Sequence, residues 1–403
     1  MTLDDCRWLV SDAATPWLAR VREELADYHG PTAGLLSRLR KDLSPERAHL
    51  VVEQVELRRR AREKFALADR MFFTRKGLEQ ATDEQVAMVK AARFPTGAVA
   101  DLCCGVGGDT LALARRTPTQ IASAELKAVE LDPSVAVLAV ANLWVHGCEN
   151  MSVVTADAAA FSVADYAAWH IDPDRRAEGR RTSRVELCAP SLDALERLLT
   201  QNINAAIKLA PAAEAPPHWC EAAELSWLGS RGECRQQVAW FGTLARQAGQ
   251  RSATIVDARG GERTVVGEPE DPIPVAPRLG HYLYEPHAAV LAAKLSGAEC
   301  REHSLAAVSS GIAYLTSDAL IDEPACEAFE IRDVLPLDQK LLRAYFRERH
   351  IGRLEVKKRG VEIDPEKLRK AVIGAGDGEA TLVVGRVHGA VQAIVARRIS
   401  PTG

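Results

Sequence analysis

Residues 99–114 read Val99-Ala100-Asp101-Leu102-Cys103-Cys104-Gly105-Val106-Gly107-Gly108-Asp109-Thr110-Leu111-Ala112-Leu113-Ala114. The pattern predicts a short buried strand, a glycine turn and a helix, because an apolar run of this kind is typical of a parallel strand covered on both faces. Gly105, Gly107 and Gly108 have no Cβ, so the backbone turns tightly and approaches a ligand closely. The free N–H groups at the start of the helix face the turn. The stretch therefore predicts a site for a small polar ligand.

Length and composition are those of an ordinary globular protein. The 403 residues suffice for two or three domains, and 47% hydrophobic and 26% charged residues are average values. A formal net charge of −4 predicts no overall attraction to nucleic acid, so a nucleic-acid surface has to be a local patch. The nine cysteines form no C-x-x-C pair, which predicts reduced thiols in the cytoplasm. We expect no membrane span and no secretion signal.

Two ligand-binding templates compete for the glycine turn. The dinucleotide template G-x-G-x-x-G has Thr110 in place of its third glycine. The other template, an acid followed by small residues at alternate positions, is met by Asp101, Cys103, Gly105 and Gly107. With a cysteine at the first glycine position, this pattern resembles motif I of class I S-adenosylmethionine (SAM)-dependent methyltransferases. The sequence Asp-Leu-Cys-Cys-Gly-Val-Gly-Gly is especially similar to motif I of the trimethylguanosine synthase branch of this family.

Acidic residues end the next two predicted strands, 124–130 and 151–157. A carboxylate at Glu130 is placed to accept hydrogen bonds from both ribose hydroxyls of a nucleoside, and Asp132 is left to cap the helix that begins at Pro133. The resemblance implies that Leu131 lies against the adenine and that Asp157 pairs with its amino group. The predicted SAM-binding residues are Asp101, Cys103, Gly105, Gly107, Asp109, Glu130, Leu131, Asp157 and Ala158.

A fourth predicted strand runs into Asp172-Pro173-Asp174-Arg175, where the family's methyl acceptor meets the sulfonium. Many amino-methylating members have (Asn/Asp/Ser)-Pro-Pro-aromatic here, whereas Asp-Pro-x-Arg resembles the Asp-Pro-Pro-Arg of uracil C5 methyltransferases. Those enzymes need a nucleophilic cysteine just after the fifth strand, and after 205–211 no cysteine occurs before Cys220. We therefore expect direct transfer to nitrogen or oxygen, with a base nitrogen as the predicted target. The predicted catalytic residues are Asp172, Pro173 and Arg175, with Asp172 as proton acceptor; an Asp before Pro also fits a plain turn.

Three regions are predicted along the chain. Residues 1–94 form a helical region, with Ser44-Pro45 starting one helix and a Thr82–Gln85 capping box starting another. Residues 95–266 form an α/β domain with a Rossmann-like seven-stranded SAM methyltransferase sheet, whose last two strands are expected at 236–241 and 252–256. Residues 267–279 contain four prolines and are interpreted as a linker.

Residues 278–403 form a predicted α+β domain. We expect a helix to begin within 282–290, followed by alternating strands and helices, including strands at 329–334, 380–386 and 391–398 and a helix from Pro365. This arrangement resembles the ferredoxin-like plus THUMP-like region of a bacterial group of SAM-dependent methyltransferases. THUMP-type modules present RNA to attached catalytic domains, so the resemblance implies an RNA partner.

Two basic clusters are candidates for phosphate contacts. Each also fits a solvated surface without a partner. The predicted RNA-binding residues are Arg58, Arg59, Arg62, Lys357, Lys358 and Arg359. His281, His287 and His303 are too loosely arranged in the sequence to indicate a metal site, and we expect none.

The sequence thus predicts a cytoplasmic class I methyltransferase that binds SAM and methylates structured RNA, either rRNA or tRNA. One alternative is a methyltransferase for a small molecule or protein, in which the C-terminal domain serves only for assembly. A second is a nicotinamide-dependent oxidoreductase, which Thr110 disfavours. A third is a SAM-binding protein without catalysis. The oligomeric state is left open.

Overall fold

A computed structural model describes residues 1–27, 32–116, 126–148, 151–174, 176–177, 180–181, 185–257 and 259–399. The chain divides into two compact units. Unit 1 comprises Met1–Leu225 and Gln236–Gly249, and unit 2 comprises Ser226–Arg235 and Gln250–Gly403. The sequence-based domain ranges remain predictions.

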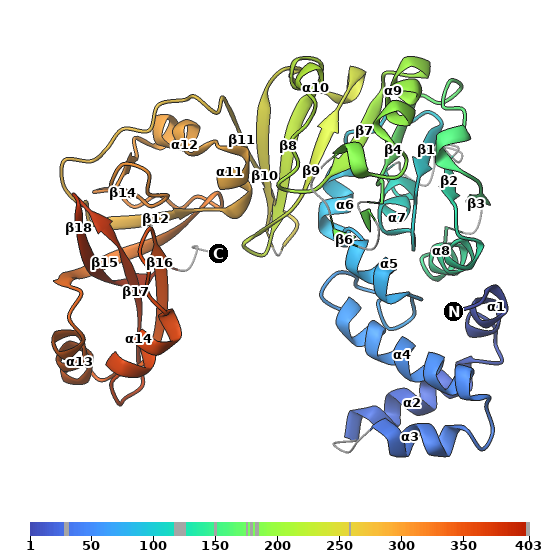
Figure 1. The fold of residues 1–403 in the computed structure, drawn as a ribbon, viewed down its shortest axis with the longest axis horizontal. Helices are drawn as coiled ribbons and strands as arrows, with labels where there is room; N and C mark the ends of the chain where they lie inside the picture. The colour runs from blue at the N-terminus through green and yellow to red at the C-terminus, as the bar shows by residue number, and fades with distance from the viewer. Residues whose placement is uncertain are drawn as a thin grey trace. The chain divides into compact units, whose positions relative to one another are not determined.

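Unit 1 begins with a series of helices, drawn in blue in Figure 1. They are α1 Leu3–Leu9, α2 Thr15–Asp27, α3 Thr32–Leu39, α4 Pro45–Ala61, α5 Arg75–Gln80 and α6 Glu84–Ala91. Ser44 caps α4 and Pro45 is its first residue, as predicted. Apolar side chains of α1 to α4, among them Leu9, Leu35 and Val51, form one buried cluster that also includes Leu138 of the α/β part. The helical region is therefore packed onto the α/β part through a shared core.

The predicted capping box at Thr82–Gln85 is wrong. Helix α6 begins one residue later, with Asp83 as its N-cap accepting from Val86 N at 3.0 Å. The Thr82 hydroxyl is buried and donates to Asp109 Oδ2 at 2.8 Å. A buried acceptor therefore decides the orientation of Thr82, and the next residue caps the helix.

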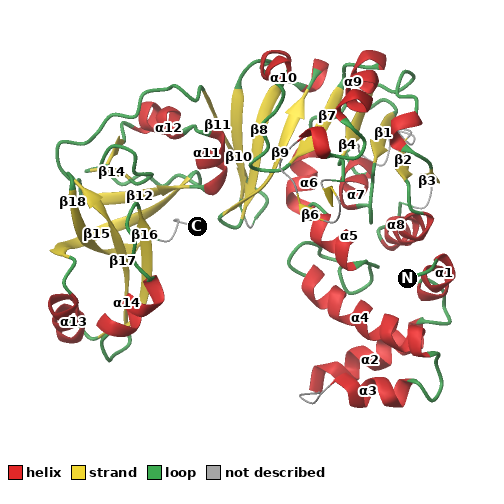
Figure 2. Ribbon diagram, viewed as in Figure 1, coloured by secondary structure: helices red, strands yellow, loops and turns green. Residues whose placement is uncertain are grey.

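The largest sheet has the strand order β11-β10-β8-β9-β7-β4-β1-β2-β3 (Figure 2). The strands are β1 Val99–Leu102, β2 Leu126–Glu130, β3 Ser152–Thr155, β4 Ala168–Ile171, β7 Ala205–Leu209, β8 Glu224–Ser230, β9 Glu233–Trp240, β10 Arg251–Val256 and β11 Glu262–Gly267. Parallel pairing joins β3, β2, β1, β4 and β7, and β9 is antiparallel to β7. Strands β1, β4 and β7 are buried throughout, as expected for parallel strands covered on both faces. The predicted Rossmann-like α/β fold is confirmed, and its sheet is extended by β10 and β11.

The sequence-based interpretation missed β8. The strands predicted at 236–241 and 252–256 correspond to β9, which ends at Trp240, and to β10, and neither is the last strand of this sheet. Strand β8 is buried at every position, so its sequence lacks the alternation that marks a half-buried strand. The β8–β9 turn, Arg231–Gly232, has positive φ at both residues, as two-residue hairpins require.

Helices and short elements connect these strands. They are α7 Gly108–Ala114, α8 Pro133–Val145, α9 Leu192–Gln201 and α10 Pro217–Ala222, the 3-10 turns η1 Ala158–Ala160, η2 Val185–Leu187 and η3 Gly242–Leu244, and the paired segments β5 Arg176–Ala177 and β6 Arg180–Arg181. Helices α7 and α8 follow β1 and β2 after a few residues. Their N-termini therefore meet the carboxyl edge of the sheet, where ligands bind in open α/β folds.

Unit 2 contains a second sheet of order β13-β14-β12-β15-β18-β17-β16, antiparallel except for β16–β17. Its elements are β12 Tyr282–Pro286, α11 Ala288–Ala293, α12 Ser296–His303, β13 Ala306–Ala307, β14 Leu315–Ser317, β15 Cys326–Pro336, α13 Gln339–Glu348, β16 Ile351–Arg359, α14 Pro365–Val372, β17 Gly378–Val387 and β18 Ala390–Arg398. Leu382 and Val384 pack with α13 and α14, whereas Val383 joins a different cluster with Phe329. This alternation places one face of β17 against the two helices.

The prediction of a helix within 282–290 is wrong for residues 282–286. Residues 282–286 form β12, which pairs with β14 and β15, and the helix begins only at Ala288 with His287 as N-cap. The other expected strands and the helix from Pro365 are confirmed. All nine cysteines carry free thiols. Within the described part of the chain, none of the helices combines the length and apolar character needed to cross a bilayer.

Candidate active site

A cavity of about 910 Å³ lies in unit 1 at the carboxyl edge of β1, β2 and β4. This volume is in the range of small-molecule and cofactor sites. All of the predicted SAM-binding residues except Gly107 line this cavity. The predicted catalytic residue Asp172 lines it as well. The predicted SAM-binding residues in its wall are Asp101, Cys103, Gly105, Asp109, Glu130, Leu131, Asp157 and Ala158. Residues far apart in the sequence are thus brought to one cavity.

The glycine turn has the left-handed backbone that its sequence suggests. Cys103, Gly105 and Gly107 have φ values of 57°, 57° and 90°. At Gly105 a Cβ would meet nothing within 4 Å, so the backbone faces open space there. Cys103 adopts the left-handed conformation at a position where the family template has glycine. This conformation costs a residue with a Cβ roughly 1–2 kcal/mol. The backbone of the motif is therefore preserved although one glycine is not.

Glu130 lies against this turn. Its Oε2 accepts from Gly105 N at 2.9 Å and its Oε1 accepts from Asp132 N at 3.0 Å. The next residue, Leu131, is 67% exposed and lines the cavity. Asp132 caps α8 through Ser134 N at 2.8 Å, as predicted. A carboxylate beside an exposed apolar side chain fits the ribose and adenine of SAM.

Asp157 lies at the start of η1 on the cavity wall. It accepts from Ala159 N at 2.9 Å, so it acts as the cap of this turn. The side chain is exposed, and Ala158 behind it is buried. The cap leaves the second carboxylate oxygen of Asp157 for a ligand.

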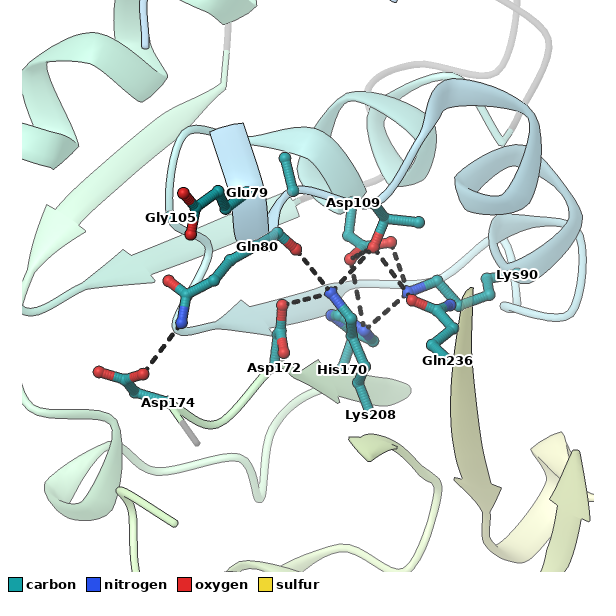
Figure 3. A network of polar contacts seen from close by, with 12 residues as sticks. Glu79, Gln80, Lys90, Gly105, Asp109, His170, Asp172, Asp174, Lys208 and Gln236 are labelled. Carbon is teal, nitrogen blue, oxygen red and sulfur yellow. Dashed lines mark hydrogen bonds and ion pairs between the residues drawn. The ribbon is translucent and has the colours of Figure 1, made fainter. Parts of the chain in front are cut away.

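A buried network of charges underlies the turn (Figure 3). Asp101 accepts from Thr110 Oγ1 at 2.5 Å, and its other oxygen lies 2.7 Å from His170 Nδ1. Asp109 Oδ1 lies 2.6 Å from Lys90 Nζ, with both side chains buried. Burial alone raises the pKa of Asp109, but the positive charge of Lys90, with His170 and Lys208, lowers it well below its usual value. Asp101 and Asp109 therefore hold the turn in place from within the protein.

Lys208 joins this network to the predicted catalytic aspartate. Its Nζ lies 2.5 Å from Asp172 Oδ2 and also donates to Gln80 O and Thr82 Oγ1, each at 3.1 Å. Lys208 is buried in β7, whereas Asp172 is partly exposed in the cavity. The prediction missed Lys208 as a site residue. A lysine within the apolar strand 205–209 is a signal, because a buried ammonium needs an acidic partner.

The loop after β4 is also held by helix α5. Asp174 accepts from Lys76 Nζ at 2.6 Å and from Gln80 Nε2 at 2.9 Å. These contacts could not be predicted from the sequence, since the partners are more than 90 positions apart. Pro173 is buried between the two aspartates, and Arg175 lies outside the described residues. The side chains of α5 thus form one wall of the acceptor end of the cavity.

The first predicted basic cluster is partly used for packing. Arg58 Nε donates to Met71 O at 2.8 Å, and its guanidinium lies 4.8 Å from the Phe72 ring centroid. Burial lowers the pKa of Arg58 to about 10. Arg62 pairs with Asp69 at 2.9 Å, and Arg59 is exposed.

The second predicted basic cluster is paired with acids within unit 2. Lys357 Nζ lies 2.6 Å from Glu285 Oε2 and 3.0 Å from Glu327 Oε2. Arg359 also contacts Glu285, at 3.0 Å, and Lys358 donates to Ile363 O at 2.6 Å. These cations are partly neutralised before any phosphate is bound.

The residues of the cavity fit SAM and define what the protein itself does. SAM supplies an electrophilic sulfonium methyl group, so the protein needs to align an acceptor and to receive a proton. Glu130, Leu131 and the glycine turn would hold the nucleoside end. Asp172, the predicted catalytic carboxylate, lines the same cavity, and its contact with Lys208 holds the side chain in place.

Comparisons with known proteins agree with this geometry. A protein-family model described as THUMP domain-like matches residues 326–398 of this chain, and a second family model, described as a domain of unknown function, matches residues 2–61. The chain is 30% identical over 351 residues to uncharacterized SAM-dependent methyltransferases from Mycobacterium tuberculosis strains CDC 1551 and H37Rv, covering 85% of this chain and 94% of each relative.

Among solved structures, the chain resembles the crystal structure of a protein from Porphyromonas gingivalis W83 that is named for methyltransferase activity. The TM-score is 0.74 at 19% identity, and the match covers 99% of this chain and 98% of that chain. This likeness concerns the fold. Because the match to the mycobacterial relatives is 30% identical and covers 85% of this chain, the chain belongs to the SAM-dependent methyltransferases. It carries a THUMP-like region near its C-terminus.

Proposed function

We propose that this methyltransferase acts on structured RNA, either rRNA or tRNA, and transfers the methyl group directly to a base nitrogen. The THUMP-like match over residues 326–398 carries the proposal of an RNA substrate. The family resemblance supports it, because THUMP-type modules present RNA to an attached catalytic domain.

The chemistry of the cavity supports direct transfer rather than a covalent cysteine intermediate. Cys103 lines the cavity, but burial raises the pKa of its thiol well above the usual value, and Glu130 adds to this effect. Burial raises the pKa of Cys104 in the same way. A thiol that stays protonated is a poor nucleophile. Asp172 is instead placed to take the proton that a base nitrogen releases on methylation.

A second candidate is a methyltransferase for a small molecule or a protein, with the C-terminal region used for assembly. The pairing of Lys357 and Arg359 with Glu285 favours it, because these cations already have acidic partners. The packing of Arg58 against Phe72 favours it as well.

The proposal is tested by deleting the gene and quantifying modified nucleosides in purified rRNA and tRNA by mass spectrometry. We expect one methylated nucleoside to disappear and to return with the wild-type gene but not with Asp172→Asn. RNA from the deletion strain is then incubated with purified protein and SAM labelled in its methyl group. Unchanged RNA nucleosides, together with label entering a protein or small-molecule fraction, would establish the second candidate instead.

A further inference from the structure

Unit 2 contains a cluster of ligand-type side chains remote in sequence from the SAM-binding residues. Glu299, Glu302 and His303 lie on α12, and one ligand atom from each falls within 4.8 Å of the others. Glu323, in the segment before β15, approaches the same imidazole, with its Oε2 3.6 Å from His303 Nε2. The sequence spacing of the histidines does not suggest this group. Glu299, Glu302 and His303 share one face of α12 because they are three and four residues apart, and Glu323 joins them because α12 lies next to the segment that precedes β15.

The cluster has unsatisfied polar atoms in the protein interior. Glu299 is 0% exposed, and its Oε1 has no hydrogen-bond partner. The Nε2 of His303 is likewise buried without a hydrogen-bond partner. Cys326 Sγ, 3.7 Å from Glu299 Oε2, is a weak donor. A buried carboxylate is strongly unfavourable unless it is protonated, paired or bound to a metal, so Glu299 and His303 point to a missing cation.

The cluster contains more acidic than basic side chains. Glu299, Glu302 and Glu323 bring three negative charges when ionised. Arg263 of β11 brings one positive charge and contacts Glu323 at 2.9 Å and Glu302 at 2.6 Å. A divalent ion complements such an acidic group, and Arg263 holds two of the carboxylates in orientation.

The distances are close to those of a metal centre. His303 Nε2 lies 3.6 Å from Glu323 Oε2, 3.8 Å from Glu299 Oε2 and 4.0 Å from Glu302 Oε1. Two donor atoms on one tetrahedral Zn²⁺, each at about 2.0–2.1 Å from the metal, are roughly 3.4 Å apart. Glu299, Glu302 and His303 offer ligand atoms within 4.8 Å of one another, and Glu323 Oε2 is 3.6 Å from the same imidazole, so a local rearrangement of these side chains is needed to bring them to one ion.

We propose that Glu299, Glu302, His303 and Glu323 form a structural binding site for one Zn²⁺ ion. One imidazole nitrogen and carboxylate oxygens are donors that Zn²⁺ accepts, and the nitrogen disfavours Mg²⁺ and Ca²⁺, which prefer oxygen alone. The ion ties α12 to the segment before β15 and, through Arg263, to β11. The site is separate in sequence and in chemistry from methyl transfer.

The test uses the full-length protein freed of metal with a chelator and titrated with ZnCl₂ by isothermal calorimetry. We expect one Zn²⁺ per chain and a higher melting temperature with Zn²⁺. The variants His303→Ala and Glu299→Gln are expected to weaken binding by about tenfold or more, since even outer residues of metal sites contribute that much. The matched control His281→Ala, which removes a histidine whose side chain is 79% exposed, retains wild-type affinity.

Cobalt provides a second measurement. Co²⁺ bound in place of Zn²⁺ is expected to give the visible absorption of a tetrahedral site, lost in His303→Ala and kept in His281→Ala. Glu299→Gln preserves the side-chain volume, and its circular dichroism and S-adenosylhomocysteine binding verify that the variant is folded. Binding that is non-stoichiometric, or equal in wild type, His303→Ala and Glu299→Gln, would overturn the proposal.

Discussion

Lys208 Nζ and Asp172 Oδ2 lie 2.5 Å apart at the carboxyl edge of the sheet, although 36 positions separate the two residues in the sequence. Lys208 has further hydrogen bonds to Gln80 O and Thr82 Oγ1, so its ammonium group is held from three sides. The carboxylate of Asp172 is therefore fixed in one orientation at the acceptor end of the cavity.

From this pair we expect Asp172→Asn to lower kcat for methyl transfer by about 100-fold or more, because a proton acceptor in the transition state is removed. Lys208→Met is expected to lower kcat as well, since Asp172 then loses its orientation. Transfer of labelled methyl to the proposed RNA substrate measures kcat. S-adenosylhomocysteine affinity, measured by calorimetry, should stay close to wild type in both variants.

The control for this pair is Lys41→Met, which removes an exposed lysine in the turn between α3 and α4. Its kcat should equal that of the wild type. If Asp172→Asn were as active as wild type with the full RNA substrate, proton transfer by this residue would be excluded.

A second prediction concerns Glu130. Glu130→Ala removes the carboxylate that accepts from Gly105 N and faces the expected ribose position. Hydrogen bonds to a charged group contribute about 1.5–3 kcal/mol, so S-adenosylhomocysteine affinity should fall about 10- to 100-fold. Glu23→Ala, at an exposed glutamate of α2 that does not line the cavity, is the matched control and should keep wild-type affinity. Equal affinities for wild type and Glu130→Ala would place the nucleoside elsewhere.

A third prediction concerns the buried pair Lys90–Asp109, in which Lys90 is 2% exposed. Lys90→Met leaves the Asp109 carboxylate buried without its closest cation, and the free energy of unfolding should fall by about 3–5 kcal/mol. Adding Asp109→Asn to Lys90→Met should recover part of this loss, because the uncompensated charge is then gone. Urea unfolding followed by tryptophan fluorescence measures both. A loss below about 1 kcal/mol for Lys90→Met would show that the ion pair is not needed.

A fourth prediction concerns pH and His287. Burial, reinforced by the charge of Arg235, lowers the pKa of His287 below its ordinary value of 6.5. Nδ1 accepts from Ala289 N at 3.1 Å, so the native cap requires the unprotonated nitrogen. The unfolded chain binds the proton more readily than the folded chain as pH falls through 6.5. The contribution of His287 to the free energy of unfolding should therefore decrease as pH falls below 7 toward its folded pKa.

Urea unfolding at several pH values between about 5 and 7.5 measures this dependence around the ordinary histidine pKa. His287→Ser keeps an N-cap acceptor but does not titrate there, so its dependence on pH should be shallower. His281→Ala, at an exposed histidine, should behave as the wild type. An unchanged slope in His287→Ser would refute the assignment.

The sequence anticipated the parts of the site that depend on local backbone conformation. Gly105 and Gly107 have the positive φ values that a tight turn demands, and Glu130 ends β2 beside them. The roles of these residues in binding SAM remain predictions. Their arrangement could be predicted because it follows from short-range spacing along one strand–turn–helix unit and the next strand.

Other features could not be predicted from the sequence, because long-range contacts override local conformational preference. Thr82 looked like an N-cap, but buried Asp109 engages its hydroxyl. Residues 282–286 looked like the start of a helix, but strand partners on both sides hold them extended. Strand β8 is buried on both faces and shows no alternation.

By itself, the sequence determined the α/β class, the glycine turn and the order of the acids along the carboxyl edge, because these depend on residue type and on spacings of a few residues. The tertiary structure decided which charges meet: Lys208 with Asp172, Lys90 with Asp109, and His303 with Glu323. An ion pair depends on the distance between two side chains in space. That distance is set when helices and strands pack around a common core, so no local spacing encodes it.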